Sequence, residues 1–371
     1  MNKKILISIN TSWNIINFRL GLLQALQKEG YQIIVLAPKD NYSELFQDYD
    51  FEYHDIEMNN KGTNPIEDLK LTISYYKILK KIKPDLMLNY TIKPNIYGTI
   101  AANLLNIATI NNIAGLGTLF VNENFITKIA KYLYKYSQDK ASKVFFQNNE
   151  DFELFTSSGL VDIYKSDVLP GSGVNTEIFK PVEKTKNLEK VVFLLISRML
   201  WDKGVGEYVE AARILTKKYP NIEFQLLGFL DVVNNSAISK EQMDTWVNEG
   251  IINYLGTSDN VKNEISNADC MVLPSFYREG TPRTLLESAS MAKPIVTTDN
   301  IGCKDVVNDG ESGYLCKIKD AIDLASKLEL IINMSEEERK AMGQKGREKI
   351  KKEFDEKIVI DKYVNAIKKI I

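Results

Sequence analysis

Two hydrophobic periods alternate along the chain. Short apolar runs such as Ile5–Ile9 and Val191–Ser197 indicate strands, and the longer stretches between them follow the helical period. Regular alternation of the two predicts a mainly parallel α/β sheet. We expect strands in the first half at 5–9, 32–37, 51–56, 85–89, 109–113, 143–147 and 167–169, and in the second half at 191–197, 223–227, 252–255, 270–273 and 294–298.

A linker divides this pattern into two halves. Pro170–Gly173 contains one proline and two glycines, and a Lys/Glu-rich stretch follows at Pro181–Lys190. A length of 371 residues is long for one hydrophobic core and fits two domains of common size. We therefore expect one domain over residues 1–175, a second over 176–355, and a closing helix over 356–371.

The segment Ser275–Glu287 predicts a loop that leads directly into a helix. Thr281 suits the N-cap and Pro282 suits the first helical position, where its missing N–H costs nothing. The apolar run Met271–Pro274 indicates a buried strand that ends at this loop. Because the first amides of a helix and its dipole favour an anion, the segment predicts a phosphate site.

Two carboxylates, Glu279 and Glu287, flank this helix start. Their eight-residue separation corresponds to about 12 Å at the helical rise, whereas the two carboxyl groups of a retaining glycosidase lie about 5 Å apart. They are therefore suited to hold two parts of one elongated ligand. The alternative is structural, with Glu279 capping the helix and Glu287 on a solvated face.

A second anion-binding candidate follows the apolar run that begins at Val191. Arg198 and Lys203 lie just after the carboxyl end of this predicted strand, where open α/β sheets bind ligands. A guanidinium fork and an ammonium suit a diphosphate.

Composition excludes several function classes. The formal charge of −2, from 47 basic and 49 acidic residues, creates no overall field for nucleic acid. Cys270, Cys303 and Cys316 lack metal-ligand spacing and suit a reducing compartment. The single histidine, His54, argues against a histidine-based metal site or triad. The N-terminal run is better explained as a strand than as a signal peptide, and no run approaches a membrane-spanning length, so we expect a cytoplasmic protein.

The motifs together resemble a known family. Arg198 and Lys203 form R-x4-K-G, and Glu279 and Glu287 form E-x7-E about eighty residues later. This pair is similar to that of the family-4 retaining glycosyltransferases, and further segments occur in the family's order at 169–175, 225–228, 254–257 and 302–307. Within that family the chain most resembles the bacterial capsule, O-antigen and PglA-type enzymes, which extend undecaprenyl-diphosphate-linked glycans.

The resemblance implies the GT-B fold, with two Rossmann-like domains whose parallel sheets face each other across a cleft. The first domain would bind the acceptor and the second the nucleotide sugar, and the closing helix would pack back on the first. It also implies that Glu279, Arg198 and Lys203 are catalytic, with Glu279 facing the sugar and Glu287 the ribose. The donor-binding residues would be Arg198, Lys203, Thr257, Glu279, Gly280, Thr281, Pro282, Arg283 and Glu287.

The implied reaction transfers N-acetylgalactosamine, or another hexose or N-acetylhexosamine, from a UDP-sugar with retention. It would need no metal and no cofactor besides the nucleotide sugar. A glycosyltransferase with a soluble acceptor, a UDP-sugar epimerase or phosphorylase of the same fold, and a non-catalytic sugar-binding module are the alternatives.

The first half carries the candidates for acceptor binding. Asn17 and Arg19 follow the first strand, and Lys93 follows the strand that ends near Asn89, so the two cations could neutralise an acceptor diphosphate. Gly115 and Gly117 could form a tight loop facing the cleft.

Two basic segments in the same half could contact a membrane. Leu69–Lys83 carries five lysines and no acid, and Ile126–Phe146 carries five lysines and Asp139, so their local charges are +5 and +4. Tyrosines 75, 76, 132, 134 and 136 lie among the lysines. Such helices can lie on anionic lipid at the inner face of the plasma membrane, or they can simply pack one face on the sheet.

Overall fold

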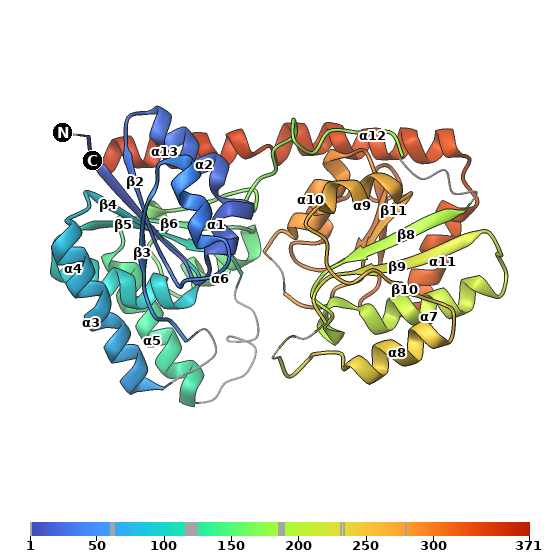
Figure 1. Cartoon of the computed structure of the whole chain (residues 1–371), viewed down its shortest axis with the longest axis horizontal. Coiled ribbons are helices and arrows are strands. Elements are labelled where there is room, and N and C mark those ends of the chain that lie inside the picture. Colours follow the sequence, from blue (N-terminus) through green and yellow to red (C-terminus); the bar gives the residue numbers. More distant parts are fainter. Residues whose placement is uncertain are drawn as a thin grey trace. The chain divides into compact units, whose positions relative to one another are not determined.

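The computed structural model describes residues 2–59, 64–115, 125–184, 190–230, 232, 234–278 and 280–371. The chain divides into two compact units (Figure 1). Unit 1 comprises Met1–Ser172 together with Glu356–Ile371, and unit 2 comprises Gly173–Asp355. Each unit is built on one parallel sheet, which confirms two Rossmann-like α/β domains.

The described sheet of unit 1 has the strand order β3-β2-β1-β4-β5-β6-β7. All neighbours are parallel, and β1 aligns Ile5 with Ile33 of β2 on one side and with Leu86 of β4 on the other. Its central strands are almost entirely buried because helices cover both faces. The strands are β1 (Lys4–Ser8), β2 (Gln32–Ala37), β3 (Glu52–Asp55), β4 (Leu86–Tyr90), β5 (Ala108–Ile113), β6 (Lys143–Phe146) and β7 (Ser166–Val168).

The helices of unit 1 form two layers around this sheet. One core cluster joins the sheet to α1, α2 and α13, and two others join it to α3, α4, α5 and α6. The helices are α1 (Ser12–Phe18), α2 (Leu20–Lys28), α3 (Pro65–Ile82), α4 (Thr99–Leu104), α5 (Phe125–Lys140), α6 (Asn149–Ser157) and α13 (Glu356–Ile370). The last of these lies beside α2, so the end of the chain completes the first unit.

The described sheet of unit 2 has the order β10-β9-β8-β11-β12-β13, again parallel. The strands are β8 (Val191–Ile196), β9 (Ile222–Leu227), β10 (Asn253–Tyr254), β11 (Cys270–Leu273), β12 (Ile295–Thr298) and β13 (Gly313–Cys316). The helices are α7 (Val205–Thr216), α8 (Lys240–Asn248), α9 (Val261–Asn267), α10 (Arg283–Ser290), α11 (Ala321–Ile332) and α12 (Glu336–Glu353). One core cluster includes α7, α8 and α11, and another includes α9 and α10.

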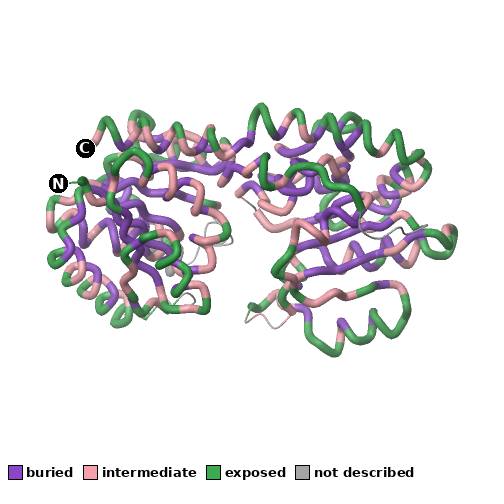
Figure 2. Tube along the Cα trace, turned by 45° about the horizontal axis from the view of Figure 1, so that its top comes forward, coloured by how far each residue is buried: buried purple, intermediate pink, exposed green. Residues whose placement is uncertain are grey.

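The burial pattern follows this layering (Figure 2). Strand residues are mostly buried, and the outward faces of the surface helices are mostly exposed. Local signals also agree with the fold: Asn64 caps α3 ahead of Pro65, and Ser335 and Glu338 form a capping box on α12. In the described ranges, no helix combines the length and hydropathy needed to cross a membrane.

Two sequence expectations need correction. The strand β13 was not predicted, because the short segment Gly313–Cys316 begins with glycine and follows polar residues, so it becomes a strand only by pairing with β12. The helix α10 begins at Arg283, and Pro282 occupies the N-cap position that we expected for Thr281. Proline has no side-chain acceptor, so the N-cap residue itself supplies no hydrogen bond to the first turn of the helix.

Candidate active site

Close backbone approaches gather several loops at the carboxyl edge of the unit 2 sheet. A Cβ on Gly204 would lie 2.0 Å from the carbonyl oxygen of Pro274, and one on Gly228 would lie 1.8 Å from that of Ser197. Both glycines also have positive φ. Only glycine therefore allows the loop after β8 to pack against those after β9 and β11.

The backbone carbonyl of Asp202 joins the two sequence motifs. It accepts hydrogen bonds from the amides of Phe276 and Tyr277, both 3.0 Å long, and from Ser275 Oγ. Asp202 lies between Arg198 and Lys203 in sequence, and Ser275–Tyr277 lead towards the carboxylate motif. The structure thus brings together two segments that are separated by about seventy residues in the chain.

Two lysines hold the aromatic rings of this loop. The ammonium of Lys203 lies 5.1 Å from the centroid of the Tyr277 ring, and that of Lys319, in the loop after β13, lies 4.5 Å from the Phe276 ring. The Nδ2 of Asn300 also donates to the carbonyls of Ser275 and Tyr277. The loop that precedes α10 is therefore fixed from several neighbouring loops.

The described donor candidates lie around this loop. Arg198 and Thr257 are exposed at the ends of β8 and β10, while Lys203 and Gly280 are partly buried. Thr281 is buried just before α10, and Pro282 and Arg283 form its start. Glu279, the candidate for the sugar end of the donor, lies outside the described residues. The expected distance of about 12 Å between Glu279 and Glu287 therefore stays a prediction.

Glu287 is buried on the second turn of α10, and the Nε of Arg283 donates to its Oε1 at 2.9 Å. Burial raises the pKa of the Glu287 carboxyl, and the neighbouring Arg283 guanidinium opposes that shift. The solvated-face alternative for Glu287 is therefore wrong.

The acceptor candidates occupy different environments in unit 1. Asn17 is exposed and donates to the Trp13 carbonyl at 2.8 Å. Lys93 is ion-paired with Asp68 of α3 at 2.8 Å, and each of these two side chains is only 13% exposed. Gly115 has a φ of +117° at the end of a described range, and Gly117 lies outside those ranges.

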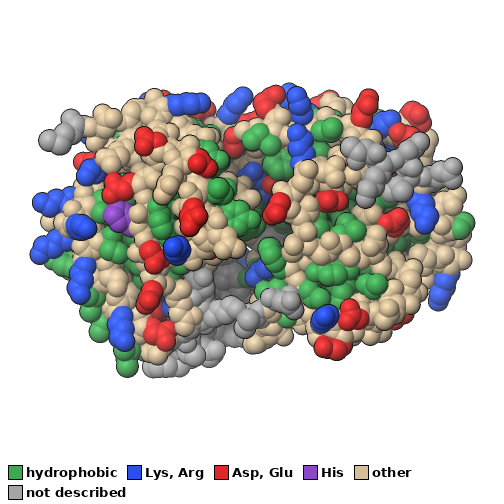
Figure 3. Space-filling view, in the orientation of Figure 1, with side chains coloured by type: hydrophobic (Ala, Val, Ile, Leu, Met, Phe, Trp, Pro, Cys, Tyr) green, Lys and Arg blue, Asp and Glu red, His purple; other side chains and the backbone are tan. Residues whose placement is uncertain are grey.

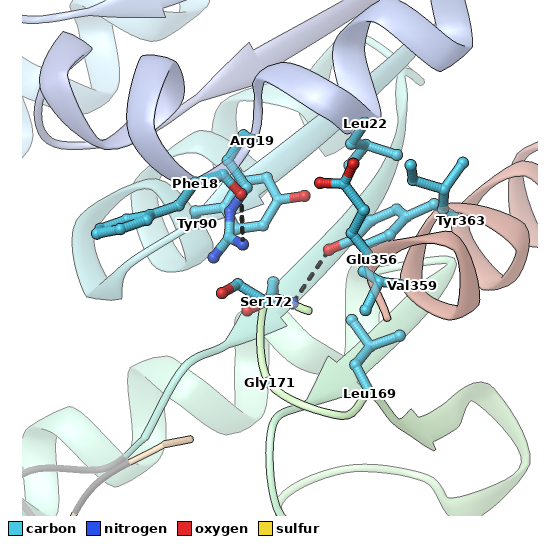
Figure 4. A pocket seen from close by; sticks show the side chains of 12 residues that line it. Phe18, Arg19, Leu22, Tyr90, Leu169, Gly171, Ser172, Glu356, Val359 and Tyr363 are labelled. Atoms are coloured by element: carbon cyan, nitrogen blue, oxygen red, sulfur yellow. Dashed lines mark hydrogen bonds between the residues drawn. The ribbon is translucent and has the colours of Figure 1, made fainter. Parts of the chain in front are cut away.

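Arg19 lies in a small pocket of unit 1 instead of on its surface (Figure 4). Its guanidinium stacks on Tyr90 at 4.6 Å, and its Nε has no hydrogen-bond partner within the described residues. Figure 4 shows Tyr363 and Val359 of α13 on the other side of this pocket. A buried guanidinium with an unused donor is a favourable partner for an anion or for a ligand oxygen.

The segment after β4 has further features of a functional site. Thr91, a β-branched residue, has a φ of +66°, and a π-helical turn follows at Pro94–Gly98. Buried amides lie beneath it: Asn89 Nδ2 donates to Asn111 Oδ1 at 3.0 Å, and Asn111 Nδ2 donates to Gln138 Oε1 at 2.9 Å. Such a network holds the carboxyl ends of β4 and β5 in one arrangement.

Sequence reasoning missed the supports of the site. Asp202 acts through its backbone carbonyl, which no side-chain pattern reveals, and Lys319 follows the unpredicted strand β13. Asn300 could have been found, because it follows the predicted strand 294–298 at the same sheet edge as the donor motifs.

Two family models match the chain, one in each unit. The model described as Glycosyl transferase 4-like matches residues 4–148, and the model described as Glycosyl transferases group 1 matches residues 176–349. Together the two matches cover most of the chain, which is a glycosyltransferase. The R-x4-K-G and E-x7-E motifs of this glycosyltransferase both fall within the second match.

Relatives and solved structures agree with this assignment. The glycosyltransferase is 29% identical to the N,N'-diacetylbacillosaminyl-diphospho-undecaprenol alpha-1,3-N-acetylgalactosaminyltransferase of Campylobacter jejuni, over 96% of both chains. It is 27% identical to the UDP-Gal:alpha-D-GlcNAc-diphosphoundecaprenol alpha-1,3-galactosyltransferase of Escherichia coli, over 69% of this chain and 68% of that one. The crystal structure of a Rickettsia africae glycosyltransferase superposes with a TM-score of 0.82 at 19% identity, covering 100% of this chain and 98% of the other. The GT-B architecture is thereby confirmed.

Proposed function

We propose that this glycosyltransferase transfers a sugar, N-acetylgalactosamine or another hexose or N-acetylhexosamine, from a UDP-sugar to an undecaprenyl-diphosphate-linked saccharide, with retention. The observation that carries the proposal is the Asp202 carbonyl, which joins the cationic motif to the loop before α10 in one unit. The names of the Campylobacter and Escherichia relatives, both of which specify undecaprenol diphosphate, support the acceptor class.

In the proposed mechanism Arg198, Lys203 and the backbone N–H groups around Gly280, Thr281 and Arg283 stabilise the charge that develops on the leaving diphosphate. Glu279 holds sugar hydroxyls and faces the oxocarbenium-like centre, and Glu287 binds the ribose. The departing phosphate oxygen takes the proton of the attacking acceptor hydroxyl. No histidine base is required by this scheme.

The function is tested by incubating the purified protein with UDP-, GDP- and ADP-sugars, with and without a polyprenyl-diphosphate-linked saccharide. We expect transfer from a UDP-sugar that depends on the lipid-linked acceptor and keeps the anomeric configuration. Conversion of the UDP-sugar without acceptor would instead favour an epimerase, a demand for inorganic phosphate would favour a phosphorylase, and equal use of a free sugar would favour a soluble acceptor.

We expect full transferase activity in the presence of a chelator. Arg198 and Lys203 would supply the positive charge that a divalent cation supplies in metal-dependent enzymes, so removal of metal should leave kcat unchanged. The measurement compares initial rates in EDTA and in added manganese. An absolute requirement for manganese would contradict the metal-free mechanism.

For the acceptor diphosphate we propose Arg19 and Lys93, with Asn17, Gly115 and Gly117 on neighbouring loops. The unused donor of Arg19 and the strained Thr91 support a ligand site at the carboxyl ends of β1 and β4. Lys93 would have to exchange Asp68 for a phosphate, since the two are paired in this structure.

The outer face of α3 is a candidate surface for the membrane. Along one stripe it exposes Ile66 (66%), Leu69 (62%) and Ile73 (45%), followed by lysines 77, 80 and 81. Figure 3 shows Lys and Arg side chains together with hydrophobic ones over this helix, along the left edge. On α5, Ile129, Tyr132 and Tyr136 are also exposed, whereas Tyr75 and Tyr134 are buried in the core and could not contact lipid. Apolar and cationic side chains on one face suit an anionic bilayer surface such as the inner face of the plasma membrane.

We expect the protein to co-sediment with anionic liposomes at low salt. Replacing Ile66, Leu69 and Ile73 together by serine should abolish binding at every salt concentration, because the apolar contact is lost. Replacing lysines 77, 80 and 81 by glutamine should remove the part of the binding that salt screens. As a control, Ile163→Ser with Tyr164→Ser alters exposed residues far from α3 in sequence and should have no effect. No binding of the unaltered protein at low salt would contradict the membrane proposal.

A further inference from the structure

The side chain of Arg283 connects two parts of unit 2. Arg283 is the first residue of α10 and is only 13% exposed. Its Nε donates to Glu287 Oε1 at 2.9 Å, one helical turn further along, and its Nη1 donates to the carbonyl oxygen of Gly173 at 2.7 Å. One planar guanidinium therefore binds a carboxylate with one nitrogen and a backbone carbonyl with another.

The second of these bonds fixes the guanidinium in place. Gly173 is the first residue of unit 2, and its φ of +68° places its carbonyl in a conformation that glycine adopts without strain. A side chain whose guanidinium is held by two hydrogen bonds has few alternative rotamers. It is thus preorganised to hold Glu287 rather than to follow a mobile ligand.

The ion pair also acts on the charge of Glu287. This carboxyl is buried, and burial raises its pKa, whereas Arg283 acts in the opposite direction. A buried carboxylate that loses a hydrogen-bonded cationic neighbour tends to take up a proton. Arg283 therefore favours the ionised form, which accepts hydrogen bonds with both oxygens.

We propose that Arg283 is a positioning residue, which keeps Glu287 ionised and oriented to accept hydrogen bonds from the ribose hydroxyls of a nucleoside diphosphate. This inference rests on the proposed function, because it takes Glu287 as the ribose ligand. It assigns the side chain of Arg283 a role distinct from the phosphate contacts expected of the backbone amides at the start of α10. Ribose recognition would then depend on the hydrogen bond from Arg283 of α10 to the carbonyl of Gly173.

The test compares the binding of UDP and of 2′,3′-dideoxy-UDP by calorimetry. For Arg283→Gln we expect UDP to bind at least ~10-fold more weakly, while the affinity for dideoxy-UDP changes less than ~2-fold, so that the preference for ribose is lost. Glu287→Gln should lose the same preference. Arg283→Lys, which keeps the charge but not the planar fork, should restore part of it.

The pH dependence gives a second readout. In Arg283→Gln the pKa of Glu287 should rise further, because the cation that lowers it is removed. As the pH is lowered, the variant should therefore begin to lose UDP affinity at a higher pH than the unaltered protein does. Dideoxy-UDP affinity should show no such displacement.

Arg347→Gln is the matched control. Arg347, on α12, is also partly buried and donates to backbone carbonyls of unit 2, at Ser290, the end of α10, and at Thr176. It should leave the ratio of UDP to dideoxy-UDP affinity unchanged. If Arg347→Gln lost the ribose preference too, or if Arg283→Gln weakened both ligands equally, Arg283 would be a general structural residue and the inference would be overturned.

Failure of the proposed function gives a different result. If the unaltered protein bound no UDP and transferred no sugar, the donor assignment itself would fall, whatever the variants did. If Arg283→Gln did not fold, as judged by its thermal transition, Arg283→Lys would carry the test, with a partial loss of ribose preference expected and an unchanged preference contradicting the inference.

Discussion

Glu279→Gln should abolish sugar transfer while UDP still binds. In the proposed mechanism this carboxylate acts at the sugar end of the donor, so its charge matters where the oxocarbenium-like character develops and matters little to the nucleotide. The two measurements are the rate of transfer to a polyprenyl-linked saccharide and the affinity for UDP by calorimetry.

The matched control is Glu287→Gln on the same motif. It should weaken UDP binding itself, because Glu287 is assigned to the ribose and lies eight residues further along the chain. If Glu279→Gln lost UDP affinity as much as it lost rate, the assignment of Glu279 to the sugar end would be wrong.

Arg198→Ala and Lys203→Ala should each raise the activation free energy of transfer by ~2 to 4 kcal/mol, the range for removing one preorganised donor from a leaving group. That corresponds to a loss in kcat/KM of roughly 30- to 1,000-fold. Both cations lie on the loop after β8, which Asp202 ties to the segment before α10.

Lys203 also contacts the ring of Tyr277. The effect of losing this contact must be distinguished from the effect of losing the proposed contact with the diphosphate. Tyr277→Leu removes the ring while leaving the ammonium in place, so we expect it to cost much less than Lys203→Ala. Equal losses in the two variants would show that Lys203 acts by supporting the loop and not by stabilising the leaving group.

The local pattern was sufficient for most of the secondary structure. Every predicted strand overlaps an observed one, because a strand buried on both faces needs a continuous apolar run such as that of β1 or β8. One observed strand, β13, was not predicted, because its four residues are specified by pairing with β12 and not by their own hydropathy. The start of α10 differed by one residue, since Pro282 satisfies the backbone preference of an N-cap without supplying a side-chain bond.

Charge was harder to interpret from sequence than hydrophobicity. Lys93 is followed by no acidic residue nearby, yet Asp68, twenty-five positions earlier on α3, is its ion-pair partner. Arg19 had the pattern of a loop cation and is instead buried on Tyr90 under α13, a helix from the far end of the chain. Whether a charged side chain is solvated depends on residues that only the fold brings near it.

The sequence by itself determined the parallel α/β architecture, the division into two halves and the family motifs, because these depend on local periodicity and on residue types at fixed spacing. Tertiary structure alone decided how the motifs meet. The Asp202 carbonyl bonds to the loop at Phe276, Lys319 lies on a ring forty-three positions away, and Arg283 joins Glu287 to Gly173. These contacts join backbone groups and side chains that are remote in the chain, and no one-dimensional pattern specifies which remote groups will meet.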